Sequence, residues 1–239
     1  MSDDQEAARP DGIRDGEHGP DRPRWLDEVF TPGARFYSDD ANSVVTIDPL
    51  RTVATFSLVR GPLMVADPAY VAASHFDDCL LVDLPAGTYP IQEAGYTYKC
   101  EFMGEPLVMR EELAMRILVS AQPTDHWSMA LPEFGDIRSL PDGQAYGFGV
   151  DSGCGCLLDA AAKEGLVQAV GVGSPAGDDS TYPLYIDPLT EAELLVFPTG
   201  GDGRFPVWVG HGQDGSITSV VFPMPFTFHA LKSFEGKFE

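Results

Sequence analysis

Short stretches of alternating apolar and polar residues, rich in Val, Ile, Thr and aromatic side chains, run through the chain from Asn42 onward. This period of two is typical of β-strands with one buried face. Gly, Pro, Asn and Asp separate nearly all of the stretches, as expected for strands joined by turns. The pattern predicts strands over residues 43–47, 52–58, 63–66, 79–84, 97–102, 114–120, 127–131, 145–150, 156–158, 193–197, 205–209 and 216–222.

Helical patterns are sparse by comparison. Residues 69–74 follow an Asp-Pro step, and residues 159–169 begin at Asp159, whose carboxylate can cap the first amides of a helix. A third short helix is expected after Thr190. Many short strands and few helices predict an α+β fold that is mainly antiparallel β, sandwich or barrel-like, with two or three short helices.

The N-terminal segment differs in composition from the rest of the chain. It is rich in Asp, Glu, Gly, Pro and Arg without apolar periodicity, so ordering it would cost backbone entropy without burying apolar surface. We predict a disordered acidic arm over residues 1–24 and a single β-rich globular domain over residues 25–239. A basic leader and a long apolar run are both missing, so we expect a cytoplasmic protein that does not enter a membrane.

The formal net charge of −22 narrows the choice of partner. Nucleic-acid backbones and anionic lipids bind through Lys and Arg, so both are disfavoured. A basic protein would be attracted, and the attraction would weaken as salt rises. Solubility alone, or a salt-rich cytoplasm, also accounts for the charge.

Cysteine usage indicates a reducing compartment. Cys79, Cys100, Cys154 and Cys156 are too few for a disulfide scaffold in a chain of 239 residues. The Cys-x-Cys pair at Cys154 and Cys156 is one residue shorter than the usual zinc-binding spacing, and no second pair completes four ligands. Core or strand cysteines are the favoured interpretation, and neither a metal nor a cofactor is expected.

The segment 147–159 is rich in glycine and also contains Asp151, Cys154 and Asp159. One hypothesis is an anion-binding nest of exposed backbone amides, with Asp151 positioning a water or a metal. The alternative is a hairpin that turns at residues 151–153, with small residues kept for packing and Asp159 as a helix cap.

A second turn-rich segment, residues 198–215, contains Asp-Gly steps at Asp202 and Asp214. An oxygen-rich cation site is one interpretation, but the alternating ligands of a calcium loop are missing, so hairpin turns are favoured. Complete catalytic motifs are also missing, because the histidines are scattered and no serine elbow accompanies them. The candidate ligand-binding residues are Asp151, Cys154, Asp159 and Asp202.

Several of these segments, over roughly residues 60–225, resemble a bacterial family, Domain of Unknown Function 4241. The shared motifs are Pro-Ala-Gly-Thr-Tyr-Pro at 85–90, strands at 114–117 and 127–130, the run from Phe148 to Asp159, and Gly-Asp-Gly-Arg-Phe-Pro at 201–206. Ser152, Phe205, Val209 and Gly212 depart from the family pattern, and Gly212 takes a position that is more often Asp. The resemblance implies no known activity.

Two functions therefore remain as hypotheses. The first is an acidic binding module, an immunity-type protein that neutralises a basic partner, since extreme acidity accompanies a β-rich domain without catalytic motifs. The second is a small-ligand-binding protein or enzyme that uses the loop 147–159 together with Asp202. The second hypothesis requires Asp151, Asp159 and Asp202 to converge on one cleft.

Overall fold

The computed structural model describes residues 23–38, 43–76, 78–141, 144–172, 181–224 and 231–233. Most of the predicted arm, and residues 173–180 of a long Gly-rich loop, lie outside these ranges. The described residues form the expected α+β fold, with mainly antiparallel strands and few short helices. None of their helices is long and apolar enough to cross a membrane.

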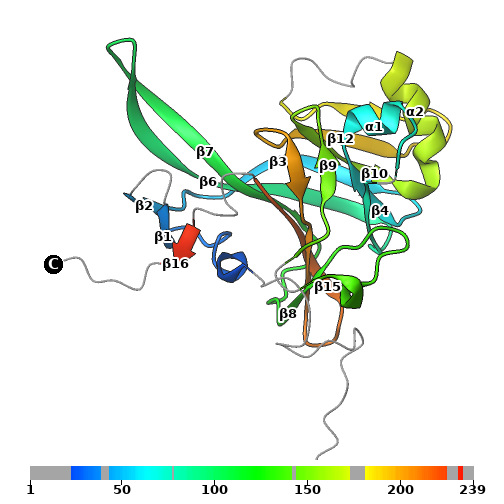
Figure 1. Cartoon of the computed structure of the whole chain (residues 1–239), viewed down its shortest axis with the longest axis horizontal. Coiled ribbons are helices and arrows are strands. Elements are labelled where there is room, and N and C mark those ends of the chain that lie inside the picture. The colour runs from blue at the N-terminus through cyan, green and yellow to red at the C-terminus, as the bar shows by residue number, and fades with distance from the viewer. Residues whose placement is uncertain are drawn as a thin grey trace, which may run out of the picture.

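The largest sheet has six antiparallel strands. In spatial order they are β3 (Arg51–Leu58), β6 (Gly87–Phe102), β7 (Glu105–Leu118), β15 (Ile217–Pro223), β14 (Trp208–His211) and β8 (His126–Met129). β6 and β7 are much longer than the pattern of residues 97–102 and 114–120 predicts, and they project from the body as a hairpin (Figure 1).

A second sheet has five antiparallel strands. In spatial order they are β11 (Leu184–Ile186), β12 (Glu193–Pro198), β10 (Cys154–Asp159), β4 (Leu63–Ala66) and β5 (Leu80–Val82). The main core contains buried side chains from both sheets, among them Leu157 of β10 and Val220 of β15. The two sheets therefore form a sandwich around this core.

Two helices cover the outer face of the five-stranded sheet (Figure 1). They are α1 (Pro68–Ala72) and α2 (Lys163–Val172), the latter preceded by the 3-10 turn η3 (Ala160–Ala162). Because side chains alternate along a strand, Leu157 enters the main core while its neighbours Cys156 and Leu158 pack among the helices. A sheet covered on both faces explains why β4 is buried at every residue.

The two predicted helices are thus confirmed with small shifts in their ends, but the expected helix after Thr190 is wrong. There the carboxylate of Asp187 accepts hydrogen bonds from the Leu189 amide and the Thr190 hydroxyl and closes a turn. The chain then enters β12 at Glu193. A local side-chain hydrogen bond has competed with helix formation.

A smaller layer covers the outer face of the six-stranded sheet. It contains the 3-10 turn η1 (Arg24–Asp27) and a sheet in the order β16 (Leu231–Ser233), β1 (Arg35–Ser38) and β2 (Ser43–Thr46). Trp25, Phe36 and Val45 bury their side chains here against Trp208 and Val221. The sequence pattern had indicated neither β1 nor β16.

The smallest sheet pairs β9 (Phe148–Val150) with β13 (Gly203–Phe205). The predicted hairpin at residues 151–153 is therefore wrong, because β10 pairs with β4 and β12 instead of β9. The predicted strand 205–209 is likewise divided, since β13 ends at Phe205 and β14 begins at Trp208. The β9–β13 pairing brings the turn at 151–153 beside Asp202.

Candidate functional site

The turn at residues 151–153 is held by a buried carboxylate that precedes α1. Asp67 is fully buried and caps α1 by accepting the Ala69 amide at 2.7 Å. Its other oxygen accepts the backbone N–H groups of Asp151 at 2.8 Å and Ser152 at 2.9 Å. The Ser152 hydroxyl donates to the same carboxylate at 2.8 Å. Charge-assisted bonds of this kind are stronger than neutral ones, so the turn is rigidly placed.

Asp151 points its own carboxylate outward from this turn. The residue is exposed and accepts a hydrogen bond from the Tyr70 hydroxyl at 2.6 Å. This hydrogen bond to the carboxylate is the main reason that the pKa of Tyr70 rises to about 12. No described Lys, Arg or His forms an ion pair with Asp151.

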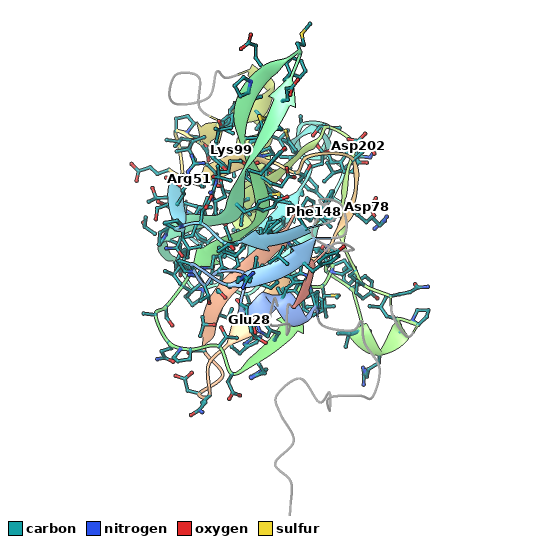
Figure 2. The ribbon with its side chains drawn as sticks, turned by 90° about the vertical axis from the view of Figure 1, so that its left-hand side faces the viewer. Glu28, Arg51, Asp78, Lys99, Phe148 and Asp202 are labelled. Atoms are coloured by element: carbon teal, nitrogen blue, oxygen red, sulfur yellow. The ribbon has the colours of Figure 1, made fainter. Side chains whose placement is uncertain are left out.

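Asp202 is the second exposed carboxylate at the turn. Its Oδ1 accepts the amide of Gly153 at 3.2 Å. Gly153 follows Asp151 by two residues, so both carboxylates lie at the same turn. Asp78 lies nearby, since its carbonyl accepts the amide of Gly149 in β9, but its carboxylate pairs with Arg204 at 2.6 Å. Figure 2 shows Asp78 and Asp202 on the same side of the molecule. We call Asp151 and Asp202 the turn carboxylates.

The anion-binding nest proposed for this loop is occupied by the protein itself. The amides of Asp151 and Ser152 donate to Asp67, and the amide of Gly153 donates to Asp202. An incoming anion would therefore meet carboxylates in place of free N–H groups. The chemistry of the turn favours a cationic group.

Asp159 lies at the other end of β10 and is fully buried. Its Oδ2 accepts the amides of Val59, Arg60 and Gly61 at 3.1, 2.7 and 3.3 Å. Its Oδ1 accepts the Ala161 amide at 2.9 Å, so the predicted helix cap is present. The structure does not bring Asp159 together with the turn carboxylates.

The two cysteines of the glycine-rich segment both have their pKa shifted upward. Burial, helped by the negative charge of Asp67, raises the pKa of Cys154, which is partly buried. Complete burial raises the pKa of Cys156 well above its ordinary value. A nucleophilic cysteine needs the opposite shift, so neither thiol is activated in this structure. All four cysteines are free of disulfides.

Sequence spacing missed one further pair. His126 in β8 and His211 in β14 are cross-strand neighbours, and their rings stack with centroids 4.8 Å apart. The His211 Nε2 also lies 2.8 Å from the Ser128 hydroxyl. Across the described ranges, no three His, Cys, Asp or Glu side chains are grouped so that they could hold a metal ion.

The sequence pattern also did not indicate that Asp67 and Tyr70 belong to the site. The Asp-Pro step at Asp67 was visible as a helix start, but its contact with Asp151, 84 positions away, follows only from the fold.

The fold and the turn carboxylates together define a mainly antiparallel α+β protein with an acidic surface turn. A family model described as "Protein of unknown function (DUF4241)" matches residues 56–222. The chain belongs to this family. No curated protein and no solved structure matches it.

Proposed function

We propose that the chain is an acidic binding module whose turn carboxylates engage a basic protein partner. Asp151 and Asp202 are exposed and both lie at the turn 151–153, because Asp67 holds the Asp151 amide and Asp202 accepts the Gly153 amide. Carboxylates fixed in this way lose little conformational freedom on binding, so they can form ion pairs at low entropic cost. This arrangement is the observation that carries the proposal.

The charge of the whole chain supports the same class of partner. A net charge of −22 steers cations toward the surface and repels nucleic acid and anionic lipid. More specifically, we propose that the chain is an immunity-type protein that neutralises its basic partner in the cytoplasm. The free cysteines are compatible with that reducing compartment.

The experiment is affinity capture from a lysate of the source cells at low salt, with three immobilised proteins. These are the wild type, Asp151→Asn/Asp202→Asn, and the control Glu28→Gln/Glu133→Gln. The control also removes two exposed carboxylates, and Figure 2 shows Glu28 far from Asp202.

We expect the wild type and the control to capture the same basic protein, and the Asp151→Asn/Asp202→Asn variant to lose it. Raising the salt should release the partner from the first two. Equal capture by all three proteins would show that the turn carboxylates play no part. Absence of any specific protein at low salt would count against the binding module itself.

A small-ligand site remains the second candidate, because the Asp202 hydrogen bond to Gly153 places two carboxylates at one turn. Such a site would consist of Asp151 and Asp202 without Asp159, which is buried elsewhere. Retention of a compound from the low-molecular-mass fraction of the lysate, lost in Asp151→Asn/Asp202→Asn, would favour this candidate over a protein partner.

A further inference from the structure

The hairpin of β6 and β7 extends far beyond the sheet that carries it (Figure 1). β3 pairs with β6 only up to Glu93, and β15 pairs with β7 only from Ala114. Residues 95–102 and 105–112 therefore form a two-stranded ribbon, closed by a turn at Met103 and Gly104, both with positive φ. A two-stranded ribbon is marginally stable by itself in water.

The two faces of the ribbon differ in polarity. Directly opposed residues share a face, so Tyr98 and Met109 lie on one side with Cys100 and Leu107. Tyr98, Leu107 and Met109 are 37%, 41% and 40% exposed, and Phe102 at the end of the same face is 66% exposed. The opposite face is mixed, since Lys99 and Glu101 lie there across from Val108 and Pro106 of β7. The ribbon thus presents an apolar face that the described part of the chain leaves open.

Beyond Gly95, the outer edge of β6 is also unpaired among the strands that the structure describes. The Gly95 carbonyl accepts the Asp48 amide at 2.9 Å on the side away from β7. Because backbone groups alternate along a strand, the N–H and C=O groups of Lys99 and Glu101 point to the same outer side. No described strand pairs with them there. Such an edge is a template for another strand.

We propose that the outer edge of β6 pairs antiparallel with the same edge of a second copy, with Cys100 at the centre. In this register Lys99 lies opposite Glu101 of the second copy, and the same ion pair forms again on the other side of the two-fold axis. Tyr98 lies opposite Phe102 of the second copy, also twice. The segment from Tyr98 to Phe102 is therefore complementary to itself in charge and in aromatic pairing.

The neighbouring registers lack this match. A centre at Lys99 places the two lysines directly opposite each other, and a centre at Glu101 does the same with the two glutamates. Like charges in directly opposed positions destabilise a strand pair. Among these registers, only the one centred on Cys100 pairs unlike charges.

The distribution of charge favours a second copy as the occupant. Two chains of net charge −22 repel each other over most of their surface. Residues 95–104 contain one Lys and one Glu, so this edge is formally neutral. The projecting ribbon also holds the two acidic bodies apart. Salt screens charge repulsion over a Debye length of about 8 Å at physiological ionic strength, so the remaining repulsion between the bodies is weak. The product is a four-stranded ribbon, which is more stable than two strands.

Cys100 supplies a direct test of the register. Its backbone groups point toward β7, so the two Cys100 residues would form a non-hydrogen-bonded pair with Cα atoms about 4.5 Å apart. That separation falls within the range of disulfide bonds, about 4.4–6.8 Å. With an added oxidant that takes up two electrons and two protons, the two thiols would join as a disulfide. We expect the wild type and Cys154→Ser to form a covalent dimer, and Cys100→Ser to form none.

Sedimentation under reducing conditions tests the pairing without the disulfide. We expect a concentration-dependent dimer for the wild type, about tenfold weaker for Lys99→Glu and restored to within threefold in Lys99→Glu/Glu101→Lys. Association driven only by the apolar face would not show this loss in Lys99→Glu and recovery in Lys99→Glu/Glu101→Lys. A monomeric wild type at every concentration, an unaffected Lys99→Glu dimer, or a cross-link that persists in Cys100→Ser overturns the proposal. This dimer does not depend on the turn carboxylates.

Discussion

Asp67 and Asp151 are joined by a hydrogen bond of 2.8 Å from the Asp151 amide to the buried Asp67 carboxylate. The two aspartates have different roles. Asp67 satisfies backbone donors and fixes the turn, whereas the Asp151 carboxylate is left outside with only the Tyr70 hydroxyl as a bonded partner among the described residues. The acidic surface of the turn therefore rests on a structural carboxylate beneath it.

Replacing the buried carboxylate should destabilise the fold. In the wild type, Asp67 Oδ1 accepts hydrogen bonds from the Ala69 amide and the Ser152 hydroxyl, and Oδ2 accepts from the Asp151 and Ser152 amides. In Asp67→Asn, one of these oxygens becomes an NH2 group that cannot accept, so its two donors lose their partner. Leaving buried donors unsatisfied should lower the free energy of unfolding by about 3 kcal/mol. Urea denaturation measures the loss. Asp202→Asn, at an exposed position, should change it by less than about 0.5 kcal/mol, and equal effects of the two variants would contradict the assigned roles.

Close packing at Gly155 predicts a second loss of stability. A Cβ atom there would lie 2.5 Å from Cζ and 2.7 Å from Cε2 of Phe197, which is itself buried. Gly155→Ala should therefore cost about 1–3 kcal/mol through overpacking. Gly201→Ala is the matched control, because a Cβ at Gly201 meets nothing within 4 Å. Similar urea midpoints for the two variants would show that the core can absorb the methyl group.

The Tyr70 hydroxyl predicts a pH dependence at alkaline pH. Its pKa is about 12 in the folded chain, above the ordinary value of about 10, because it donates to Asp151. The folded state thus binds this proton more tightly, and the contribution to stability is present below pH 10 and lost as the pH approaches 12.

Thermal or urea midpoints measured from pH 9 to 12 should therefore fall more steeply for the wild type than for Tyr70→Phe. The difference between the two curves isolates Tyr70 from the other tyrosines. Parallel curves would mean that the hydrogen bond to Asp151 does not form in solution.

The alternation of apolar residues was sufficient to predict most strands and the fold class. Val220 and Phe222 enter the main core while Val221 faces the other side, as a period of two requires. The extra length of β6 and β7 was not predictable from burial patterns, because their outer halves bury little. Turn signals identified positions where the chain changes direction, but could not say which strands then pair.

The hairpin prediction at residues 151–153 failed for that reason. A Gly-rich turn fixes local geometry, whereas the partners of β9 and β10 are chosen by long-range packing. Asp202 accepts the amide of Gly153, two residues after Asp151, whereas Asp159 accepts the amides of residues 59–61. Nothing in the local sequence distinguishes a carboxylate that caps a distant loop from one that faces solvent.

Calorimetric titration of the purified basic partner measures directly how much the turn carboxylates contribute to its binding. For the wild type, the affinity should fall as salt rises, and Asp151→Asn/Asp202→Asn should bind about tenfold more weakly at low salt, a change of about 1.4 kcal/mol. The double variant Glu28→Gln/Glu133→Gln should stay within about threefold of the wild type, because exposed charges outside the contact contribute little. Equal affinities and equal salt dependence for all three proteins would contradict the assignment of the partner to the turn carboxylates.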